Sequence, residues 1–370
     1  MSRGSSTSRD WDATARERVV TALAAVVIAI LVAGWSWSIA HARELAPAAV
    51  AERSASTFAS AISRSGAPTT AYLTDATLDA ITDRMLRSAR GISGKLRATI
   101  EPHPDPLRPD TLPPGARIEY AQPGRVAAAP TGAGIWNVLL AIGNGVRPVA
   151  NFSIIALLPF TTKQNGRIGL YYVGTWPGEH GARGPGRAPV GAYGNPAGFI
   201  EVTRENADTP VSDHFKLRDF LTHDQPNVWP KYLVLQSRLV DKLELVLSDL
   251  EAHGYDVHGV KVMSGFRSPQ YNETGGNPAG RANLSRHMYG DAADIYIDSD
   301  GDGQMDDLNH DRRVTIDDAR VIEQAADRVE AAHPELVGGA GVYTAAPGHG
   351  PFIHIDARGY RARWSGTSGG

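Results

Sequence analysis

A long apolar run lies near the N-terminus and spans residues 19–40 without a charged side chain. Such a run is long enough to cross the hydrocarbon core of a bilayer, which is about 30 Å thick. Four arginines between residues 3 and 18 precede it. By the positive-inside rule they hold residues 1–18 in the cytoplasm and place the rest of the chain outside, as in a single-pass membrane protein. The alternative is a cleaved signal peptide and a secreted protein, because Ala40-His41-Ala42 resembles a cleavage site.

The pattern changes twice between the apolar run and residue 198. Residues 41–90 predict a helical stalk, because they are rich in Ala and Ser and then show apolar positions at helical spacing. Residues 91–177 predict a small β-rich, sandwich-like domain, which serves either as a spacer or to bind the cell wall or a partner. Residues 178–198 are rich in Gly and Pro and predict a linker. The strands expected in the β-rich domain are residues 135–142, 152–158 and 168–174.

The C-terminal part, residues 199–364, mixes helical and strand patterns. An apolar stripe over residues 232–253 predicts a core helix, and Gly254 is expected to cap its C-terminal end. Residues 264–269 follow a strand pattern and predict a turn at the end of a buried strand, where a catalytic side chain is held rigidly. Short strand patterns occur at residues 199–202, 260–262 and 295–297.

Composition excludes several classes of function. The chain has 370 residues, 42% of them hydrophobic, so it can bury a full core and more than one domain is expected. A net charge of -3 gives no signature of nucleic-acid binding. The absence of cysteine excludes a disulfide scaffold, a thiol nucleophile and a lipoprotein anchor.

Two histidines and one aspartate have the composition of a catalytic zinc site: His287, Asp294 and His354. Such a set leaves one coordination position free for water, whereas structural zinc sites are closed. On a straight helix His287 and Asp294 would lie roughly 10.5 Å apart along the axis. Zinc bonds of about 2.0–2.2 Å cannot span that distance. We therefore expect irregular backbone near Gly290 and a strand that begins at Asp294.

A wider pattern surrounds these residues. The segment Ser285-x-His287-x6-Asp294, the upstream Ser264-Gly265-Phe266-Arg267-Ser268-Pro269 and the closing His354-x-Asp356 resemble the zinc D-Ala-D-Ala carboxypeptidase family. That family includes VanX- and VanY-type enzymes and is distantly similar to hedgehog and lysostaphin. The ending, with Gly341-Val342-Tyr343 and Arg363-Trp364, resembles the murein endopeptidase branch. The likeness covers about residues 195–364.

The resemblance implies a fold, a set of roles and a substrate. It implies an α+β domain over residues 199–364, with a small antiparallel sheet flanked by helices. It implies that His287, Asp294 and His354 bind zinc, and that Arg267 polarises the scissile carbonyl and holds the developing oxyanion. Peptides of peptidoglycan are the implied substrates, which agrees with export to the bacterial cell envelope.

The residue that accepts the proton is open. Several members of the family have Glu or Asp three residues before the last zinc ligand, where this chain has Pro351. Asp356 is one candidate, because strand alternation puts it on the same face as His354, although it equally suits a carboxylate that orients an imidazole. His349, five residues before His354, is the other candidate.

An acidic insertion, residues 298–318, follows the expected strand at Asp294. Its first part, Asp298-x-Asp300-x-Asp302-Gly303 with Asn309 further on, fits a calcium loop except at the last position. An overlapping register repeats the ligand spacing of such loops and resembles a dockerin-type calcium loop, although Arg312 replaces the turn glycine. The alternative is a solvated acidic loop that binds no metal. The second register consists of Asp307, Asn309, Asp311, Arg313, Thr315 and Asp318.

Together these features predict a zinc-dependent peptidoglycan hydrolase of the cell envelope, a D,D- or L,D-endopeptidase or a carboxypeptidase. Its expected cofactors are Zn²⁺ and, through the acidic insertion, Ca²⁺. Its expected contacts are peptidoglycan peptides and the membrane, with no nucleic acid. The alternative from another class is a catalytically inactive metal-binding module that binds the wall or a partner protein, and Pro351 is its best support.

Overall fold

The computed structural model describes residues 75–107, 112, 115–179, 193–275 and 281–367. These residues belong to one compact unit that begins at Thr69. The expected cytoplasmic tail, the membrane span or signal peptide at residues 19–40, and most of the expected stalk lie outside the described residues. Within the described ranges, no helix is both long enough and apolar enough to cross a membrane. The fold is mixed α/β, with several small sheets and few helices.

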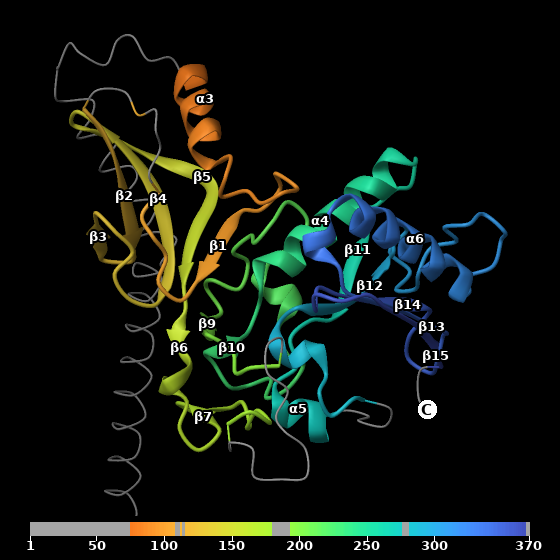
Figure 1. Ribbon diagram of the computed structural model, residues 1–370. Helices are drawn as coiled ribbons and strands as arrows, with labels where there is room; N and C mark the ends of the chain where they lie inside the picture. Colours follow the sequence, from red (N-terminus) through yellow and green to blue (C-terminus); the bar gives the residue numbers. More distant parts are fainter. Residues whose placement is uncertain (1–74, 108–111, 113–114, 180–192, 276–280, 368–370) are drawn as a thin grey trace, which may run out of the picture. The chain divides into compact units, whose positions relative to one another are not determined.

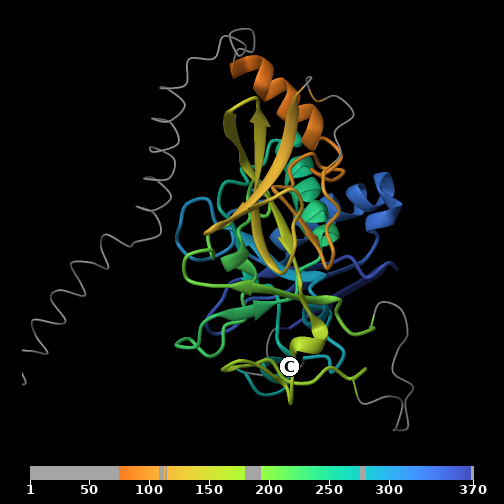
Figure 2. The same ribbon diagram turned by 90° about the vertical axis from the view of Figure 1, so that its left-hand side faces the viewer.

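The first sheet has five strands in the order β1-β5-β4-β2-β3, with β1 parallel to β5 and the other neighbours antiparallel. Helix α3 (Asp75–Leu86) lies beside this sheet (Figures 1 and 2). Met85 and Leu86 of α3 share a buried cluster with Trp136 and Phe152 of the sheet. The expected second sheet of a sandwich is therefore replaced by a helix. The strands are β1 (Ala98–Glu101), β2 (Ala116–Gln122), β3 (Arg125–Ala127), β4 (Gly134–Ile142) and β5 (Gly145–Ala156).

The segment after β5 belongs to a different core than the sequence suggests. Tyr171 and Trp176 are buried with Phe199 and Phe266 in the large cluster of the C-terminal part, and Trp176 Nε1 donates a hydrogen bond of 2.9 Å to the Met288 carbonyl. The expected division at residue 177 thus does not coincide with the division between the two cores. Short strands pair here as β10-β9-β6 and as β7-β8. Their bounds are β6 (Leu158–Pro159), β7 (Arg167–Ile168), β8 (Tyr171–Tyr172), β9 (Gly198–Val202) and β10 (Lys231–Leu233).

The C-terminal sheet has the order β11-β12-β14-β13-β15 and is antiparallel except that β13 and β15 run parallel. Helices α4 (Ser237–Ala252) and α6 (Ile316–Ala332) pack against each other, and α6 packs against β13 and β14 (Figure 1). The result is a small, mainly antiparallel sheet with helices beside it. The strands are β11 (Val260–Ser264), β12 (Ala292–Ile297), β13 (Gly339–Tyr343), β14 (Phe352–Asp356) and β15 (Ala362–Gly366).

Helix α4 matches the C-terminal end of the helix predicted from the apolar pattern, but not its N-terminal end. It begins at Ser237 rather than at residue 232, because Lys231–Leu233 forms strand β10 against β9. Its C-terminal end is as expected: Gly254 has φ 89°, and Tyr255 N–H donates a hydrogen bond of 3.1 Å to the Leu250 carbonyl. A glycine in the left-handed region and this long return bond define a Schellman cap.

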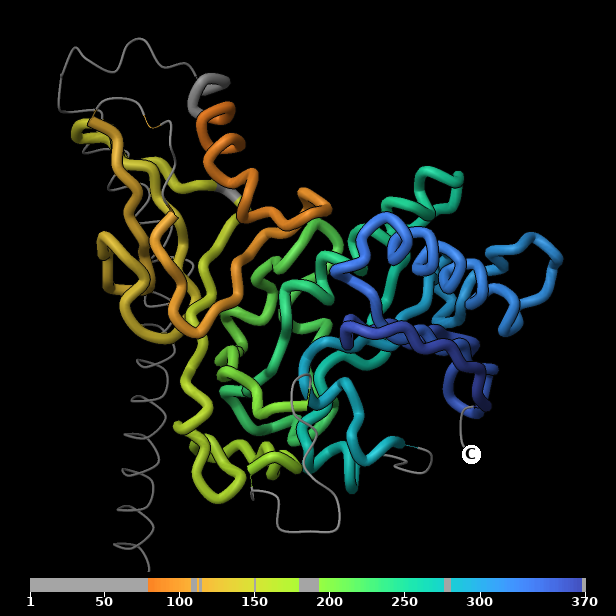
Figure 3. Tube along the Cα trace, in the orientation of Figure 1, coloured from red at the N-terminus to blue at the C-terminus, as the bar shows by residue number. Residues whose placement is uncertain are grey.

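The path of the chain in Figure 3 places one long loop, residues 298–315, between β12 and α6 at the edge of the C-terminal part. The helix after it, α6, begins at Ile316. The remaining elements are short helices: η1 (Phe160–Thr162), η2 (Leu217–Phe220), α5 (Pro269–Thr274), η3 (Arg286–Tyr289) and η4 (Pro334–Leu336).

Candidate metal centre

One row of residues runs across the C-terminal sheet and carries most of the site. In the strand register, Asp294 on β12 lies opposite Ser264 on β11 and opposite His354 on β14. The row continues through Gly341 on β13 to Trp364 on β15. Directly paired residues on neighbouring strands present their side chains to the same face. The sheet therefore places a carboxylate, an imidazole and an indole side by side.

His287 reaches this row from the short helix η3, just before β12. Gly290 ends η3 in the left-handed conformation with φ 69°. A Cβ atom at Gly290 would lie 2.4 Å from the Val234 carbonyl oxygen, so the close approach of the two segments requires glycine. The expected irregular backbone near Gly290 is confirmed, and the following strand begins at Ala292, two residues before Asp294.

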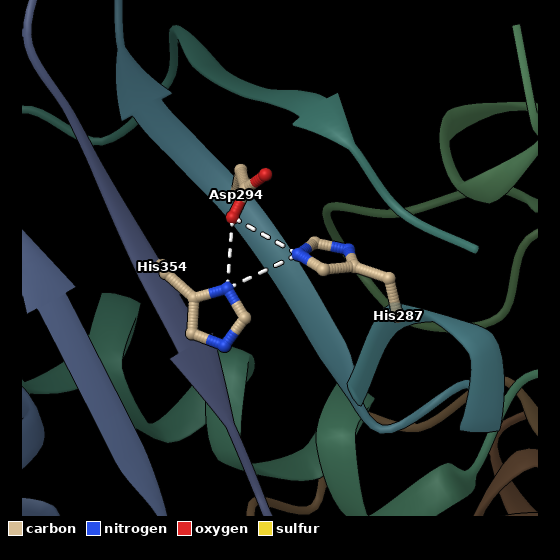
Figure 4. A group of neighbouring side chains, drawn as sticks. All are labelled: His287, Asp294 and His354. Atoms are coloured by element: carbon tan, nitrogen blue, oxygen red, sulfur yellow. Dashed lines mark hydrogen bonds and ion pairs between the residues drawn. The ribbon is translucent and has the colours of Figure 1, made fainter. Parts of the chain in front are cut away.

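One atom from each of three side chains meets at a single point, as Figure 4 shows. His287 Nε2 lies 3.1 Å from Asp294 Oδ1 and 3.1 Å from His354 Nδ1, and His354 Nδ1 lies 2.9 Å from Asp294 Oδ1. All three side chains are buried. Bonds of about 2.0–2.2 Å to a tetrahedral ion would separate its ligand atoms by roughly 3.3 Å. The three residues that the sequence places together are thus together in the fold, and the group could hold a metal ion.

The outer nitrogen of each imidazole is held by a hydrogen bond. His287 donates from Nδ1 to the Gly265 carbonyl at 2.7 Å, and His354 donates from Nε2 to Asp356 Oδ2 at 3.0 Å. A proton fixed on the outer nitrogen leaves the inner nitrogen free as a metal ligand. Gly265 lies in the turn after β11, whose position at the strand exit the sequence predicts.

Asp356 lies behind His354. Its carboxylate is fully buried and also accepts hydrogen bonds from the Gly339 N–H at 2.8 Å and from Arg358 Nε at 2.8 Å. The contact with His354 is to the ring nitrogen that points away from the three ligand atoms. This geometry is that of a carboxylate that orients a ligand, and it argues against Asp356 as the residue that accepts a proton from water.

The backbone of Asp356 is fixed from the helical side. The Lys242 ammonium on α4 is fully buried and donates 2.6 Å hydrogen bonds to the Asp356 carbonyl and to Glu330 Oε1 on α6. Burial lowers the pKa of Lys242 against the opposing effect of Glu330. Glu330 Oε2 in turn accepts a 2.6 Å hydrogen bond from Arg363 on β15. The end of strand β14 is thereby tied to both helices and to the neighbouring part of the sheet.

Arg267 lies beside the three ligand atoms and also reaches open space. Its Nε donates to Ser264 Oγ at 2.7 Å, its Nη2 pairs with Asp294 Oδ2, and Nη1 makes no hydrogen bond to any described residue. The side chain is 16% exposed. It lines a pocket of about 180 Å³ together with His223, Tyr271 and Arg281. A fixed cation thus connects the buried group to the surface.

Trp364 ends the row on β15, and His349 lies in the segment just before β14. His349 donates from Nδ1 to the Gly350 carbonyl at 2.7 Å, which leaves Nε2 without a partner in the described part of the chain, and its ring lies 5.2 Å from that of Phe352. The Trp364 ring lies 5.3 Å from that of His354. It reaches that place over Gly341, where a Cβ atom would lie 2.1 Å from Trp364 Cε2. Because Gly341 on β13 has no side chain, the Trp364 indole can cover the His354 imidazole.

The charges of the group suit a metal ligand set. Burial and the nearby Arg267 lower the pKa of His287 to about 4, so its imidazole is neutral at pH 7. Burial raises the pKa of Asp294, but His287 and Arg267 outweigh it and hold that pKa well below its usual range. Burial lowers the pKa of His354, but hydrogen bonds to Asp294 and Asp356 raise it overall. Binding of a metal ion would therefore compete with protonation of His354.

The acidic loop divides into two parts with different hydrogen bonding. In the second register, the side chains accept hydrogen bonds from the loop's own backbone. Asp307 accepts from Arg312 N–H at 2.7 Å, and Asp311 accepts from Arg313 N–H at 2.8 Å. Asn309 Oδ1 accepts from Asp311 N–H at 2.9 Å.

The end of that register serves helix α6. Thr315 is the N-cap residue of α6 and forms a capping box with Asp318, which is fully buried. Asp318 also accepts a hydrogen bond of 3.1 Å from Asn309 N–H. These hydrogen bonds cap the N-terminal end of α6, and this role of the second register needs no cation.

In the first register, Asp298 and Asp300 form a group with Asp306 in which one oxygen from each lies within 4.8 Å of the others. Asp302 is not part of that group, and its Oδ1 accepts a hydrogen bond of 2.7 Å from Gln304 N–H. The sequence interpretation missed Asp306. It lies at the ninth position counted from Asp298, where calcium loops have a ligand, so the spacing could have revealed it.

Three comparisons with known proteins were negative. No protein-family model, no curated protein and no solved structure matches this chain. The function is therefore argued from the residues and their arrangement.

Proposed function

We propose that this protein is a zinc-dependent peptidase of the bacterial cell envelope that hydrolyses peptide bonds in peptidoglycan. The observation that carries the proposal is the convergence of His287, Asp294 and His354 on one point beside the partly exposed Arg267. Two imidazoles and one carboxylate are a typical ligand set of catalytic zinc. Zinc bound there supplies a Lewis acid that activates water and polarises a carbonyl.

The protein's own groups supply position and charge. The Gly265 carbonyl and the Asp356 carboxylate hold the two imidazoles in the orientation that a metal ion needs. Arg267 is fixed by Ser264 and Asp294 and lines the pocket, and its Nη1 makes no hydrogen bond to a described residue. A preorganised cation at that place stabilises negative charge that develops on a carbonyl oxygen.

The proton acceptor in this proposal is His349. The hydrogen bonds of Asp356 to His354, Arg358 and Gly339 argue against Asp356 in that role. His349 is half-buried, and its Nε2 is free to take a proton as a general base. The segment that carries His349 leads directly into β14, the strand of His354.

The choice of substrate rests on the family likeness and on the N-terminal apolar run, which both favour the envelope. The pocket beside Arg267 also contains Arg281, so two cations face the space where a peptide would lie. Peptidoglycan peptides carry free carboxylates, which such a surface attracts. The proposal covers hydrolysis of both the terminal and the cross-linking peptide bonds of peptidoglycan.

The test is digestion of purified sacculi by the full-length protein, with the products identified by chromatography and mass spectrometry. We expect new peptide termini, one zinc per chain by elemental analysis, and no products from a His287→Ala variant. His258→Ala is the matched control, because the His258 side chain is 93% exposed and pairs with Asp256.

Three outcomes would contradict the proposal. Full activity of His287→Ala would exclude the ligand assignment. Stoichiometric iron in place of zinc would exclude zinc as the cofactor. Tight zinc binding without turnover of any muropeptide would favour a non-catalytic module that binds the wall or a partner.

A further inference from the structure

The first part of the acidic loop contains carboxylates that the proposed zinc site does not use. Asp298 follows β12 directly, and Asp300 and Asp306 lie further along the loop that Figure 3 shows before α6. One oxygen from each of the three lies within 4.8 Å of the others. Three carboxylates at such distances repel one another unless a cation lies between them.

A buried carboxylate oxygen without a partner distinguishes this group from an ordinary acidic surface. Asp298 is 5% exposed, and its Oδ2 accepts a hydrogen bond of 3.2 Å from Gly303 N–H. Its Oδ1 is buried and has no hydrogen-bond partner among the described residues. Burial of a charged oxygen without a partner is unfavourable, whereas a bound cation supplies the missing interaction.

We propose that one Ca²⁺ ion binds to Asp298, Asp300 and Asp306. Carboxylate oxygens are hard ligands, which Ca²⁺ prefers and which suit zinc less well than imidazole does. The three residues occupy positions one, three and nine of a calcium loop counted from Asp298, and each of these positions is a ligand position in such loops. Gly303 occupies position six with φ 85°, where such loops need a glycine for the turn.

The hydrogen bonds of the loop also separate the first register, which begins at Asp298, from the second register, which begins at Asp307. Asn309, at position twelve, bonds to Asp311 N–H at 2.9 Å and so belongs to the second turn of the loop. The site therefore lacks the bidentate acid that completes tight calcium loops, and water would fill the remaining positions. We expect a dissociation constant on the order of 10⁻⁵ to 10⁻³ M, the range of weak sensors and extracellular modules.

The proposed ion would fix a contact next to the candidate proton acceptor. Asp306 N–H donates a hydrogen bond of 2.8 Å to the Ile297 carbonyl, and Met305 is buried in the large core. At Gly350 a Cβ atom would lie 2.7 Å from Gln304 Oε1, so the loop lies close against the segment that follows His349. Calcium would thus stabilise the loop and, through it, the position of that segment.

The test is calorimetric titration of CaCl₂ into the full-length protein that has been freed of calcium and resupplied with one equivalent of zinc. We expect one saturable site per chain and a rise in Tm of about 4 °C at a hundredfold excess over the dissociation constant. Asp298→Asn and Asp306→Asn should each remove the binding heat and the rise in Tm. Asp311→Asn, in the second register, is the matched control and should retain both.

The Tm of the calcium-free variants distinguishes loss of calcium binding from a structural effect of the substitutions. Asp298→Asn keeps the shape of the side chain and removes a buried charge, so without calcium its Tm should equal or exceed that of the parent. Absence of binding heat in the parent, or loss of binding in Asp311→Asn with retention in Asp298→Asn, would overturn the proposal. Neither result depends on peptidase activity, so the calcium site can fail while the proposed function stands.

Discussion

The His287–Asp294–His354 group and the acidic loop are neighbours in the chain, because Asp298 begins the loop only four residues after Asp294 on β12, yet they are built in opposite ways. The first takes its ligands from η3, β12 and β14, and both its imidazoles are oriented by further hydrogen bonds. The second takes its carboxylates from nine consecutive residues and contains an oxygen that has no hydrogen-bond partner among the described residues. The sheet thus preorganises the first group before any ion binds, whereas in the proposed site Asp298 Oδ1 gains its partner from the cation.

This contrast predicts different responses to the removal of each ion, and the largest effect concerns zinc. A chelator selective for zinc should lower the rate of peptide cleavage by about 10³-fold or more, because a Lewis acid contributes several kcal/mol and each 1.4 kcal/mol is about tenfold. A calcium-selective chelator, with zinc maintained, should lower the rate only a few fold. The measurement is the initial rate on a purified muropeptide. Equal losses with both chelators would show that the two groups act as one site.

Arg267 is expected to give the next largest effect. Arg267→Ala should lower kcat by about 10²- to 10³-fold, the usual effect of losing one donor to a developing oxyanion. Arg267→Lys should recover part of that loss, since it retains charge without the planar fork that contacts both Ser264 and Asp294. The exposed Arg328→Ala, which removes an ion pair with Asp249, is the control. An unchanged kcat in Arg267→Ala would leave Arg267 as a partner of Asp294 alone.

A smaller pair of effects separates His349 from Asp356. His349→Ala should lower kcat by about 10²-fold with unchanged zinc affinity, as for loss of a general base. Asp356→Asn should lower zinc affinity by about 10- to 100-fold, because it weakens the hydrogen bond that orients His354. Competition with a zinc indicator and the rate at saturating zinc measure the two quantities separately. A loss of kcat in Asp356→Asn at saturating zinc would instead favour Asp356 as the proton acceptor.

Parts of the candidate site could be predicted from the sequence because the signal lay in residue type and spacing. The seven-residue interval from His287 to Asp294 excluded a helix and required a turn, which Gly290 forms. Strand alternation placed His354 and Asp356 on one face, and they share a hydrogen bond. Alternation does not specify which ring nitrogen faces a neighbour, so the role of Asp356 needed the structure.

Other features depend on contacts between segments far apart in the chain, which periodicity does not contain. Trp176 packs with Phe266 rather than with the sheet before it, a contact that periodicity does not indicate. The row from Ser264 to Trp364 depends on the register of five strands. The helix α3 on the first sheet likewise took the place of an expected second sheet, because short strands alone do not indicate what covers them.

The smallest expected effect tests the two overlapping registers of the acidic loop. Gly303 in the first register and Arg312 in the second both lie in the left-handed region, with φ 85° and 69°. That conformation is unfavourable for a residue with a Cβ atom by about 1 kcal/mol or more. Arg312 is exposed, so Arg312→Gly should raise Tm by roughly 2 °C in the absence of calcium.

Gly303→Ala is the matched reverse change. A Cβ atom at Gly303 meets no other atom within 4 Å, so only backbone strain is added and Tm should fall by a similar amount. The two changes should also differ with calcium present. Arg312→Gly should leave the calcium-induced rise in Tm intact, whereas Gly303→Ala should reduce it, because the turn at Gly303 brings Asp306 back toward Asp298. Equal effects of the two variants on calcium binding would mean that the ion contacts both registers.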